Sequence, residues 1–390
     1  MAQVIQSQPL IPKAPRWRTV LKGFSLGEAG IYYALALVLI VLTILSRVFE
    51  SQNFLDPGNL ANILYQASFV AIIAVPMTLV LISGNFDLSV AATAAISAAC
   101  VLLLSDQVGI FAAMAISLVP GLLAGLINAA VVQGLGINAF IVTLATMTAL
   151  RGVLLIITGG HTASADDREA LWPLKWIENG FWVTPNLLWC SGAAAIITAA
   201  IVWYRRRGVT PLVWAAAAAG MALLIAGYFV DASWPLAKPV YYMAAVTAVA
   251  WCITRFTIIG RRLQAVGANA EAARLMGISI NRYRVVPFVL NGLAASFVGL
   301  LFAARLGAVL PNAMSGMELT VITAAILGGT SLFGGSGSVL KSVTGAVVLY
   351  SLVNGFDILG LGTSYQGVIE GVVLIIAAAI YTVGKRGRRG

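Results

Sequence analysis

Long runs of apolar residues recur along the whole 390-residue chain, and each is close to the length of a membrane-spanning helix. About twenty apolar residues in a helix cross about 30 Å of hydrocarbon. The runs do not alternate between apolar and polar residues, as the strands of a membrane β-barrel do. The pattern therefore predicts an all-α polytopic membrane protein.

We expect twelve membrane spans. Their predicted limits are 31–48, 67–83, 88–104, 109–131, 138–157, 187–204, 210–230, 240–254, 285–303, 318–333, 339–355 and 365–382. The first run follows a basic segment, as in a signal peptide, but the sequence SRVFESQNF after it offers no small-residue cleavage site. We therefore expect a basic segment over 1–30, a single membrane domain over 31–383 that keeps this first span, and a basic tail over 384–390.

The basic residues indicate which way the spans run, because cytoplasmic loops of membrane proteins are enriched in Lys and Arg. If the N-terminus is cytoplasmic and the spans alternate, most of the 24 basic residues fall on the cytoplasmic side. The outer segments then hold only Arg47, Arg168, Lys175, Lys238 and Arg305. Both termini are therefore predicted to be cytoplasmic, and the net charge of +10 reflects topology rather than nucleic-acid binding.

Few residues are suited to catalysis or to metal binding. Cys100, Cys190 and Cys252 lie in separate apolar runs, where cysteine is usually a small buried hydrophobe. The single histidine, His161, lies in a polar outer loop. No GxxxxGK motif is present, so the chain is not expected to hold ATP phosphates itself. We expect no enzyme activity, no metal and no cofactor on this chain.

The sequence RRLQAVGANAEAARLMGISINRYR is a basic island within the largest internal cytoplasmic loop, 255–284. Asn269 can cap a short helix over 270–276, and Gly277 can end that helix in a left-handed turn. So short a helix is marginal alone in water and needs something to pack against.

The side chains of this short helix divide into two faces. Glu271 lies in the first turn, where the helix dipole favours an acid. Ala272, Leu275 and Met276 share one apolar face. Two alternatives fit this pattern: the helix lies on the bilayer surface between basic neighbours, or it docks into a groove on a cytoplasmic partner.

Five sequence blocks follow one another along the chain. They are LVLISGNFDLSV (79–90), NAFIVTLATMTALRG (138–152), GANAEAARLMGI (267–278), LGGTSLFGGSGSV (327–339) and NGFDILGLGTSYQGVIEGVVLIIA (354–377). Together they resemble the permease subunits of ABC importers of the ribose and xylose class, over roughly residues 54–383. The runs over 187–230 are similar to an extra helix pair of xylose-type permeases, added to a ten-helix core.

The resemblance implies a division of labour among several subunits. Two permease copies, expected to be identical, would form the pathway. A separate ATPase pair, which holds ATP and Mg²⁺, would bind the cytoplasmic face, and a soluble sugar-binding protein would deliver a monosaccharide such as xylose outside. The resemblance places the chain among the lipids of the bacterial cytoplasmic (inner) membrane.

Two contact regions follow from the resemblance and the charge pattern. The resemblance assigns coupling with the ATPase to the basic island, at Asn269, Glu271, Ala272, Ala273, Leu275, Met276, Gly277 and Ile278. On the outer side, the loops over 47–62 and 305–318 are expected to receive the sugar-binding protein. Arg305 is a candidate partner for an acid on that protein, although an exposed ion pair contributes only about 0.2–1 kcal/mol.

Asp87 is the notable acid between the second and third spans, and a bare charge there is costly unless it is paired or wetted. It either caps a helix that starts at Leu88 or marks a broken helix whose end faces the pathway. Asn85 before it, and Gly328 and Gly329 in a glycine-rich stretch, fit such unwound segments. Glycine can equally mean tight helix packing.

Other polar residues within the spans are candidates for the pathway. Asn128, Thr143, Asn291 and Asn354 either hydrogen-bond a sugar hydroxyl or bridge two helices. Arg151 either snorkels outward or lies against the subunit interface.

Two other classes of protein fit less well. A twelve-helix secondary sugar transporter, driven by an ion gradient, usually carries its long cytoplasmic loop between spans six and seven. Here that loop falls between spans eight and nine. A non-transporting membrane scaffold would have no need of the five blocks in register.

Overall fold

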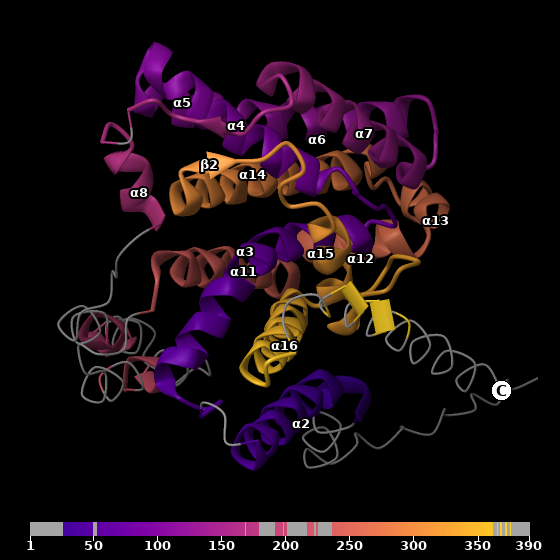
Figure 1. The fold of residues 1–390 in the computed structure, drawn as a ribbon. Coiled ribbons are helices and arrows are strands. Elements are labelled where there is room, and N and C mark those ends of the chain that lie inside the picture. Colours follow the sequence, from indigo (N-terminus) through magenta and orange to yellow (C-terminus); the bar gives the residue numbers. More distant parts are fainter. Residues whose placement is uncertain are drawn as a thin grey trace, which may run out of the picture.

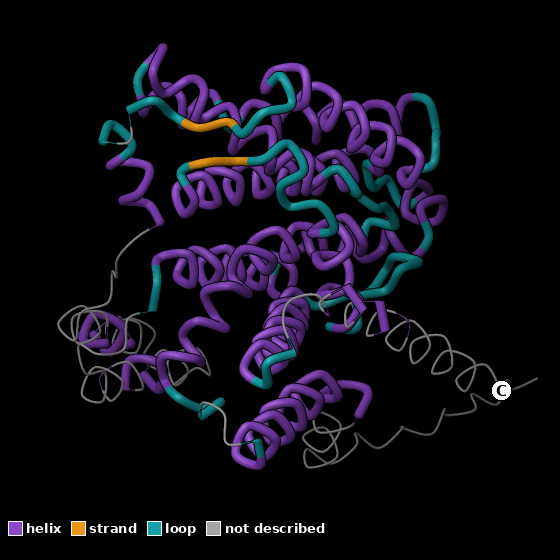
Figure 2. The backbone as a smooth tube through the Cα atoms, viewed as in Figure 1, coloured by secondary structure: helices purple, strands orange, loops and turns teal. Residues whose placement is uncertain are grey.

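The computed structural model describes residues 26–49, 53–167, 169–178 and 236–361, with short pieces between 192 and 224 and between 365 and 375. Helices make up most of this part of the chain, and its strands form one short antiparallel pair (Figures 1 and 2). The helices are α2 (Leu26–Val48), α3 (Pro57–Ile82), α4 (Val90–Val108), α5 (Ile110–Ile116), α6 (Val119–Gly134), α7 (Ala139–Thr158), α8 (Trp172–Glu178), α11 (Lys238–Phe256), α12 (Ile258–Ala268), α13 (Ala270–Leu275), α14 (Ile280–Leu306), α15 (Met317–Leu327) and α16 (Val339–Ile358).

Seven helices in the described part are long and apolar enough to cross a membrane: α2, α3, α4, α5 taken with α6, α7, α14 and α16. The pair α11 and α12, bent by 77°, is an eighth candidate if it is counted as one span. The prediction of an all-α polytopic membrane protein is therefore confirmed. The predicted spans 187–204, 210–230 and 365–382 lie mostly outside the described residues, so the total of twelve and the cytoplasmic termini stay predictions.

Two predicted spans have the wrong limits. α3 begins at Pro57, well before residue 67, because the Asp56 side chain accepts a hydrogen bond from the Gly58 N–H at 2.9 Å and caps the helix. The polar residues of its first turns hid this part of α3 from a search for apolar runs. The predicted span 318–333 is instead the 11-residue helix α15. At 1.5 Å per residue, α15 crosses only about half of the hydrocarbon layer.

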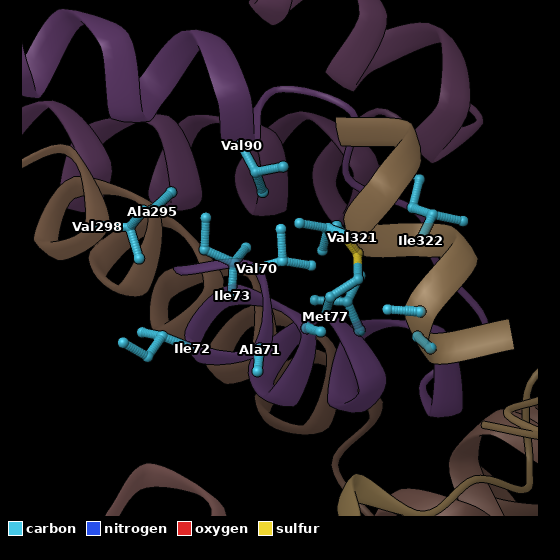
Figure 3. Packing of buried hydrophobic residues seen from close by; sticks show 14 of the residues in the cluster. Val70, Ala71, Ile72, Ile73, Met77, Val90, Ala295, Val298, Val321 and Ile322 are labelled. Carbon is cyan, nitrogen blue, oxygen red and sulfur yellow. The ribbon is translucent and has the colours of Figure 1, made fainter. Parts of the chain in front are cut away.

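α3 is the centre of the bundle. Every residue from Ala67 to Ile82 is buried, and α11, α14, α15 and α16 all pack against this helix. Figure 3 shows Val70 and Met77 of α3 in the same apolar cluster as Val298 of α14 and Val321 of α15. From Ala67 onward α3 is covered on all sides, which explains why this part of the helix has no polar face.

Glycine allows α6 and α14 to touch along their backbones. A Cβ placed on Gly121 would lie 2.1 Å from the Gly292 carbonyl oxygen, and one on Gly125 would lie 2.6 Å from the Phe288 carbonyl oxygen. Such close approach increases van der Waals contact, which stabilises helix pairs within a membrane. These glycines therefore serve helix packing.

Segments that were predicted to share one side of the membrane contact one another. The strands β1 (Ala163–Ser164) and β2 (Ala308–Val309) pair, and they join the loops that follow α7 and α14. At the other ends of α6 and α14, the Arg284 side chain donates to Gln133 Oε1 at 3.5 Å. This grouping is the one that the charge pattern requires, and which group is cytoplasmic stays a prediction.

Candidate functional site

A tight turn ends α3 and separates it from α4. Gly84 adopts a φ of +82°, which glycine adopts far more readily than other residues, and the Asn85 N–H donates to the Val80 carbonyl oxygen at 3.1 Å. The Asn85 side chain donates to Ser83 Oγ at 2.9 Å, so its bonding is local. Because α4 starts only at Val90, residues 83–89 form a break between two buried helices.

Three segments meet backbone to backbone at the end of α3. The Ile82 carbonyl oxygen accepts a hydrogen bond from the Gly335 N–H at 2.9 Å. A Cβ placed on Gly267 would lie 1.7 Å from the same oxygen, and one on Gly334 would lie 2.7 Å from the Gly267 oxygen. We call this contact among Ile82, Gly267, Gly334 and Gly335 the glycine junction. It joins α3 to the end of α12 and to the glycine-rich loop 328–338.

Gly328 and Gly329, the predicted gate residues of this loop, lie outside the junction. A Cβ on Gly328 would lie 2.5 Å from the Lys341 carbonyl carbon, so Gly328 lets the end of α15 pack on the start of α16. Gly329 has a φ of +82° and open space around its Cβ position, so the turn itself requires glycine there.

The short helix predicted in the basic island is present as α13. The Asn269 side chain accepts a hydrogen bond from the Ala272 N–H at 3.0 Å and so caps the helix. Gly277 has a φ of +75°, and its N–H donates to the Arg274 carbonyl oxygen at 2.9 Å. The predicted cap, helix and left-handed stop are therefore confirmed, with the helix one residue shorter than expected.

The apolar face of α13 is uncovered. Ala273 is 1% exposed and holds the helix against the rest of the protein, whereas Leu275 is 82% exposed and Met276 is 68% exposed. Ala272 and Glu271 are exposed as well. Because one alanine is buried while a leucine and a methionine are exposed, this helix has an apolar surface that a partner or a membrane can cover.

Asp87 organises a buried polar cluster in the break between α3 and α4. Its carboxylate accepts hydrogen bonds from the Ser89 N–H at 3.0 Å, from the Ser89 hydroxyl at 2.6 Å and from Asn291 Nδ2 at 2.9 Å. Asn128 Nδ2 donates to Ser89 Oγ at 3.0 Å, and the Thr146 hydroxyl donates to Asn128 Oδ1 at 2.6 Å. The cluster joins the break to α6, α7 and α14.

The burial of Asp87, Asn128 and Asn291 shows whether these side chains face a pathway or bridge helices. Asp87 is 1% exposed, and Asn128 and Asn291 are 0% exposed, so all three bridge helices in this conformation and none faces an open pathway. α4 begins at Val90 rather than at Leu88, and the Asp87 carboxylate makes a cap-type bond with the Ser89 N–H just before it. Among the described residues no Lys or Arg contacts Asp87, so its hydrogen bonds replace the water lost on burial.

Two members of the cluster were missed by sequence reasoning. Ser89 stands two residues after Asp87, which is the spacing of a local side-chain turn and was a usable signal. Thr146 lies close along α7 to the predicted Thr143. The Thr143 hydroxyl instead donates to the Ala139 carbonyl oxygen of its own helix at 2.8 Å.

Arg151 and Asn354 hold together loops and helix ends far from the cluster. Arg151 Nη1 donates to the carbonyl oxygens of Pro311 and Ala313, at 3.1 and 2.7 Å, and so secures the loop after β2. These bonds run toward the predicted outer side, as outward snorkelling requires, and the subunit interface stays a prediction. Asn354 Nδ2 donates to Asn59 Oδ1 at 2.9 Å and joins the end of α16 to the start of α3.

Arg305 lies beside two aromatic rings. Its guanidinium carbon is 4.9 Å from the centre of the Tyr65 ring and 5.8 Å from that of Phe69, within the range of a cation–π interaction. The Tyr65 hydroxyl donates to Glu178 of α8. Arg305 is itself exposed, so it remains accessible to a partner on this side.

A family described as "Branched-chain amino acid transport system / permease component" matches residues 59–378, which include the break, the cluster, α13 and the glycine junction. The chain belongs to this permease family. No solved structure gives a significant match.

Among named relatives, the "Ribose import permease protein RbsC" of Escherichia coli (strain K12) is 32% identical over 348 residues, 89% of this chain and 92% of the relative. The "Xylose transport system permease protein XylH" of the same strain is 33% identical over 349 residues, 85% of this chain and 87% of the relative. A xylose permease of Haemophilus influenzae is 30% identical over 379 residues, 91% of this chain and 96% of the relative. This chain is therefore similar to ribose permeases and to xylose permeases over most of its length.

The bond between Asp87 and Asn291 predicts that the two residues are energetically coupled. Asn291→Leu alone leaves a buried carboxylate oxygen without its donor, which costs about 1–3 kcal/mol or more. In an Asp87→Leu background the same change should cost less, with a coupling energy of about 0.5–3 kcal/mol. Chemical unfolding of the four purified permeases measures this coupling. Asn354→Leu, whose partner is Asn59, is the control and should be additive with Asp87→Leu; additivity of the Asn291 pair would contradict the cluster.

Proposed function

We propose that this chain is the membrane-spanning subunit of an ATP-driven sugar importer and that it transmits the movement of a separate ATPase to the translocation pathway. The observation that carries the proposal is the pairing of an uncovered apolar helix, α13, with the glycine junction directly before it. Names of the relatives supply the class of cargo, since they are ribose and xylose permeases. The chain itself is not the enzyme, because hydrolysis falls to the ATPase subunit.

α13 has the properties of a docking element. Its six residues cannot form a stable helix alone, and against the described part of the chain Ala273 is the residue of α13 that is fully buried. Leu275 and Met276 therefore present an apolar pair that a groove on another protein would cover, as in other helix-in-groove contacts. The rest of the basic-island segment, from Asn269 to Ile278, sets the position and direction of this pair.

The glycine junction supports a direct route from α13 to the core. Asn269 ends α12 and caps α13, so the two helices share one residue. Two residues before it, Gly267 lies against the Ile82 carbonyl oxygen with no side chain between them. A displacement of α13 would therefore press on the end of α3, and α3 is the helix around which α11, α14, α15 and α16 pack.

We assign the buried cluster of Asp87, Asn128 and Asn291 to the frame of the pathway rather than to contact with the sugar. The cluster fixes the break next to the junction, so it can hold α4 in place while α3 is displaced. The exposed Arg305, beside Tyr65, is our candidate contact for a sugar-binding protein on the outer side. A second, identical permease copy would complete the pathway in the bacterial inner membrane.

The cargo is proposed to be a monosaccharide of the ribose or xylose kind. The two relatives are almost equally similar to this chain, so identity does not separate the two sugars. The extra helix pair over 187–230, which favours the xylose type, lies largely outside the described residues.

Reconstituted vesicles test the proposal. The permease, its ATPase and its sugar-binding protein should accumulate labelled ribose or xylose only when ATP is present on the ATPase side. Leucine, a cargo suggested by the family description, should not enter. Accumulation driven by a proton or sodium gradient without the ATPase would instead support a secondary transporter, and ATP-driven uptake of leucine alone would refute the sugar class.

The exposed pair on α13 should be needed for the ATPase and not for folding. Leu275→Ser with Met276→Ser removes apolar surface that is already in solvent, so the stability of the permease should change by less than about 0.5 kcal/mol. The ATPase should no longer co-purify, and uptake should be lost. Leu135→Ser, an exposed leucine that follows α6 outside the basic island, is the matched control and should keep both. If the double variant keeps the ATPase and the uptake but loosens the loop from vesicles, α13 is a surface helix.

A further inference from the structure

An apolar groove of about 880 Å³ opens between α11 and α14, with α3 as its floor. Because α14 is long and apolar enough to cross a membrane and α11 packs with it against the buried helix α3, most of this groove lies at the level of the hydrocarbon. Its walls carry aliphatic side chains from three helices: Val75 and Leu79 of α3, Val249 and Ile253 of α11, and Val286 and Leu290 of α14. These walls offer few hydrogen bonds to a sugar, whose hydroxyl groups need polar partners.

α12 closes one end of the groove and marks the membrane surface there. The chain bends by 77° between α11 and α12. The bend needs Gly260, because a Cβ there would lie 2.1 Å from the Thr254 carbonyl oxygen. α12 then buries Leu263 and exposes Arg262, which is typical of a helix that lies along a membrane interface. The closed end of the groove is therefore level with the lipid headgroups.

Two arginines stand at this end of the groove. Arg262 of α12 and Arg282 of α14 both line it, and both are exposed. Within the part of the chain that the structure describes, neither guanidinium pairs with a carboxylate. Guanidinium groups bind phosphate strongly through paired hydrogen bonds, and basic pockets between spans on the cytoplasmic side bind anionic lipid headgroups.

We propose that this groove binds a phospholipid with an anionic headgroup. The acyl chains lie along Val249 and Leu290, and the phosphate lies between Arg262 and Arg282. We choose a lipid because its two parts match the two parts of the groove. Acyl chains fit the aliphatic walls, and an anionic headgroup fits the end that carries the two arginines. A protein segment at this depth would also cover the walls, but it would leave the two guanidinium groups without an anion.

The site has a consequence for coupling, which rests on the proposed function. Gly277 and Ile278, the residues that follow α13, also line the groove beside the arginines. A bound lipid would therefore brace the connection from α13 to α14.

Native mass spectrometry of the full permease tests the binding itself and needs neither ATP nor transport. The probes are phosphatidylglycerol and phosphatidylcholine with the same acyl chains. The permease should retain phosphatidylglycerol, and Arg262→Gln with Arg282→Gln should lower retention on the order of tenfold. Arg261→Gln with Arg274→Gln, which removes the same charge from the same loop outside the groove, should leave retention unchanged. Leu290→Trp, which fills the groove, should lower retention of phosphatidylglycerol with the arginines intact.

Three results would overturn the proposal. If the variant with both Arg262→Gln and Arg282→Gln retained as much phosphatidylglycerol as the unchanged permease, these arginines would not bind the headgroup. An equal loss in both arginine pairs would show only a general attraction of the basic loop for anionic lipid. A cross-link at Val249→Cys to a second permease copy, with the native cysteines replaced, would show that a protein surface occupies the groove.

Discussion

The contact of Gly267 with the Ile82 carbonyl oxygen is the constraint on which the rest of the structure depends. No side chain fits between them, since a Cβ would lie 1.7 Å from that oxygen. The same oxygen accepts the Gly335 N–H, so three separate parts of the chain are fixed on one backbone atom. One is the most buried helix, one carries the exposed α13, and one leads into α16. Contact between backbones leaves no flexible side chain to absorb a movement.

Polar groups complete this arrangement inside the membrane. The break after α3 leaves backbone groups and a carboxylate without helical hydrogen bonds, and hydrocarbon cannot solvate them. Ser89 and Asn291 donate to this carboxylate, and Asn128 donates to Ser89. The cluster fixes α4, α6, α7 and α14 around the break, while the junction ties α3 to the loop that holds the basic island. The two devices lie on either side of Gly84 and Asn85. A transporter needs such a division between a held part and a moved part.

Much of the fold could be predicted because membrane spans leave a local signal. The apolar runs gave the position of most described helices, and Asn269 with Gly277 gave α13 because caps act over three or four residues. Local signals failed where polar residues start a helix, as at Asp56 and Asn59 in α3. They failed again at α15, since an apolar run has the same composition whether it is a full or a half span.

The site could be predicted only in part, because its bonds join residues far apart in the sequence. Asp87 and Asn291 were each visible as polar residues in apolar runs, yet nothing in the sequence paired them. The partners of Arg151 are backbone carbonyl groups, which every residue has, so no residue type could reveal them. The junction was invisible for the same reason: GANAEAARLMGI shows that residue 267 is glycine and not what lies against it.

The Gly267→Ala variant, in a complex of the permease with its ATPase and its sugar-binding protein, shows whether the glycine junction transmits movement from α13 to α3. We expect the intact complex still to form through α13, but the sugar-loaded binding protein no longer to stimulate ATP hydrolysis, because the added methyl group separates α12 from α3. Gly134→Ala on α6, where a Cβ meets nothing within 4 Å, should hydrolyse ATP normally. Normal stimulation and normal uptake in an intact Gly267→Ala complex would show that the glycine junction is a packing feature alone.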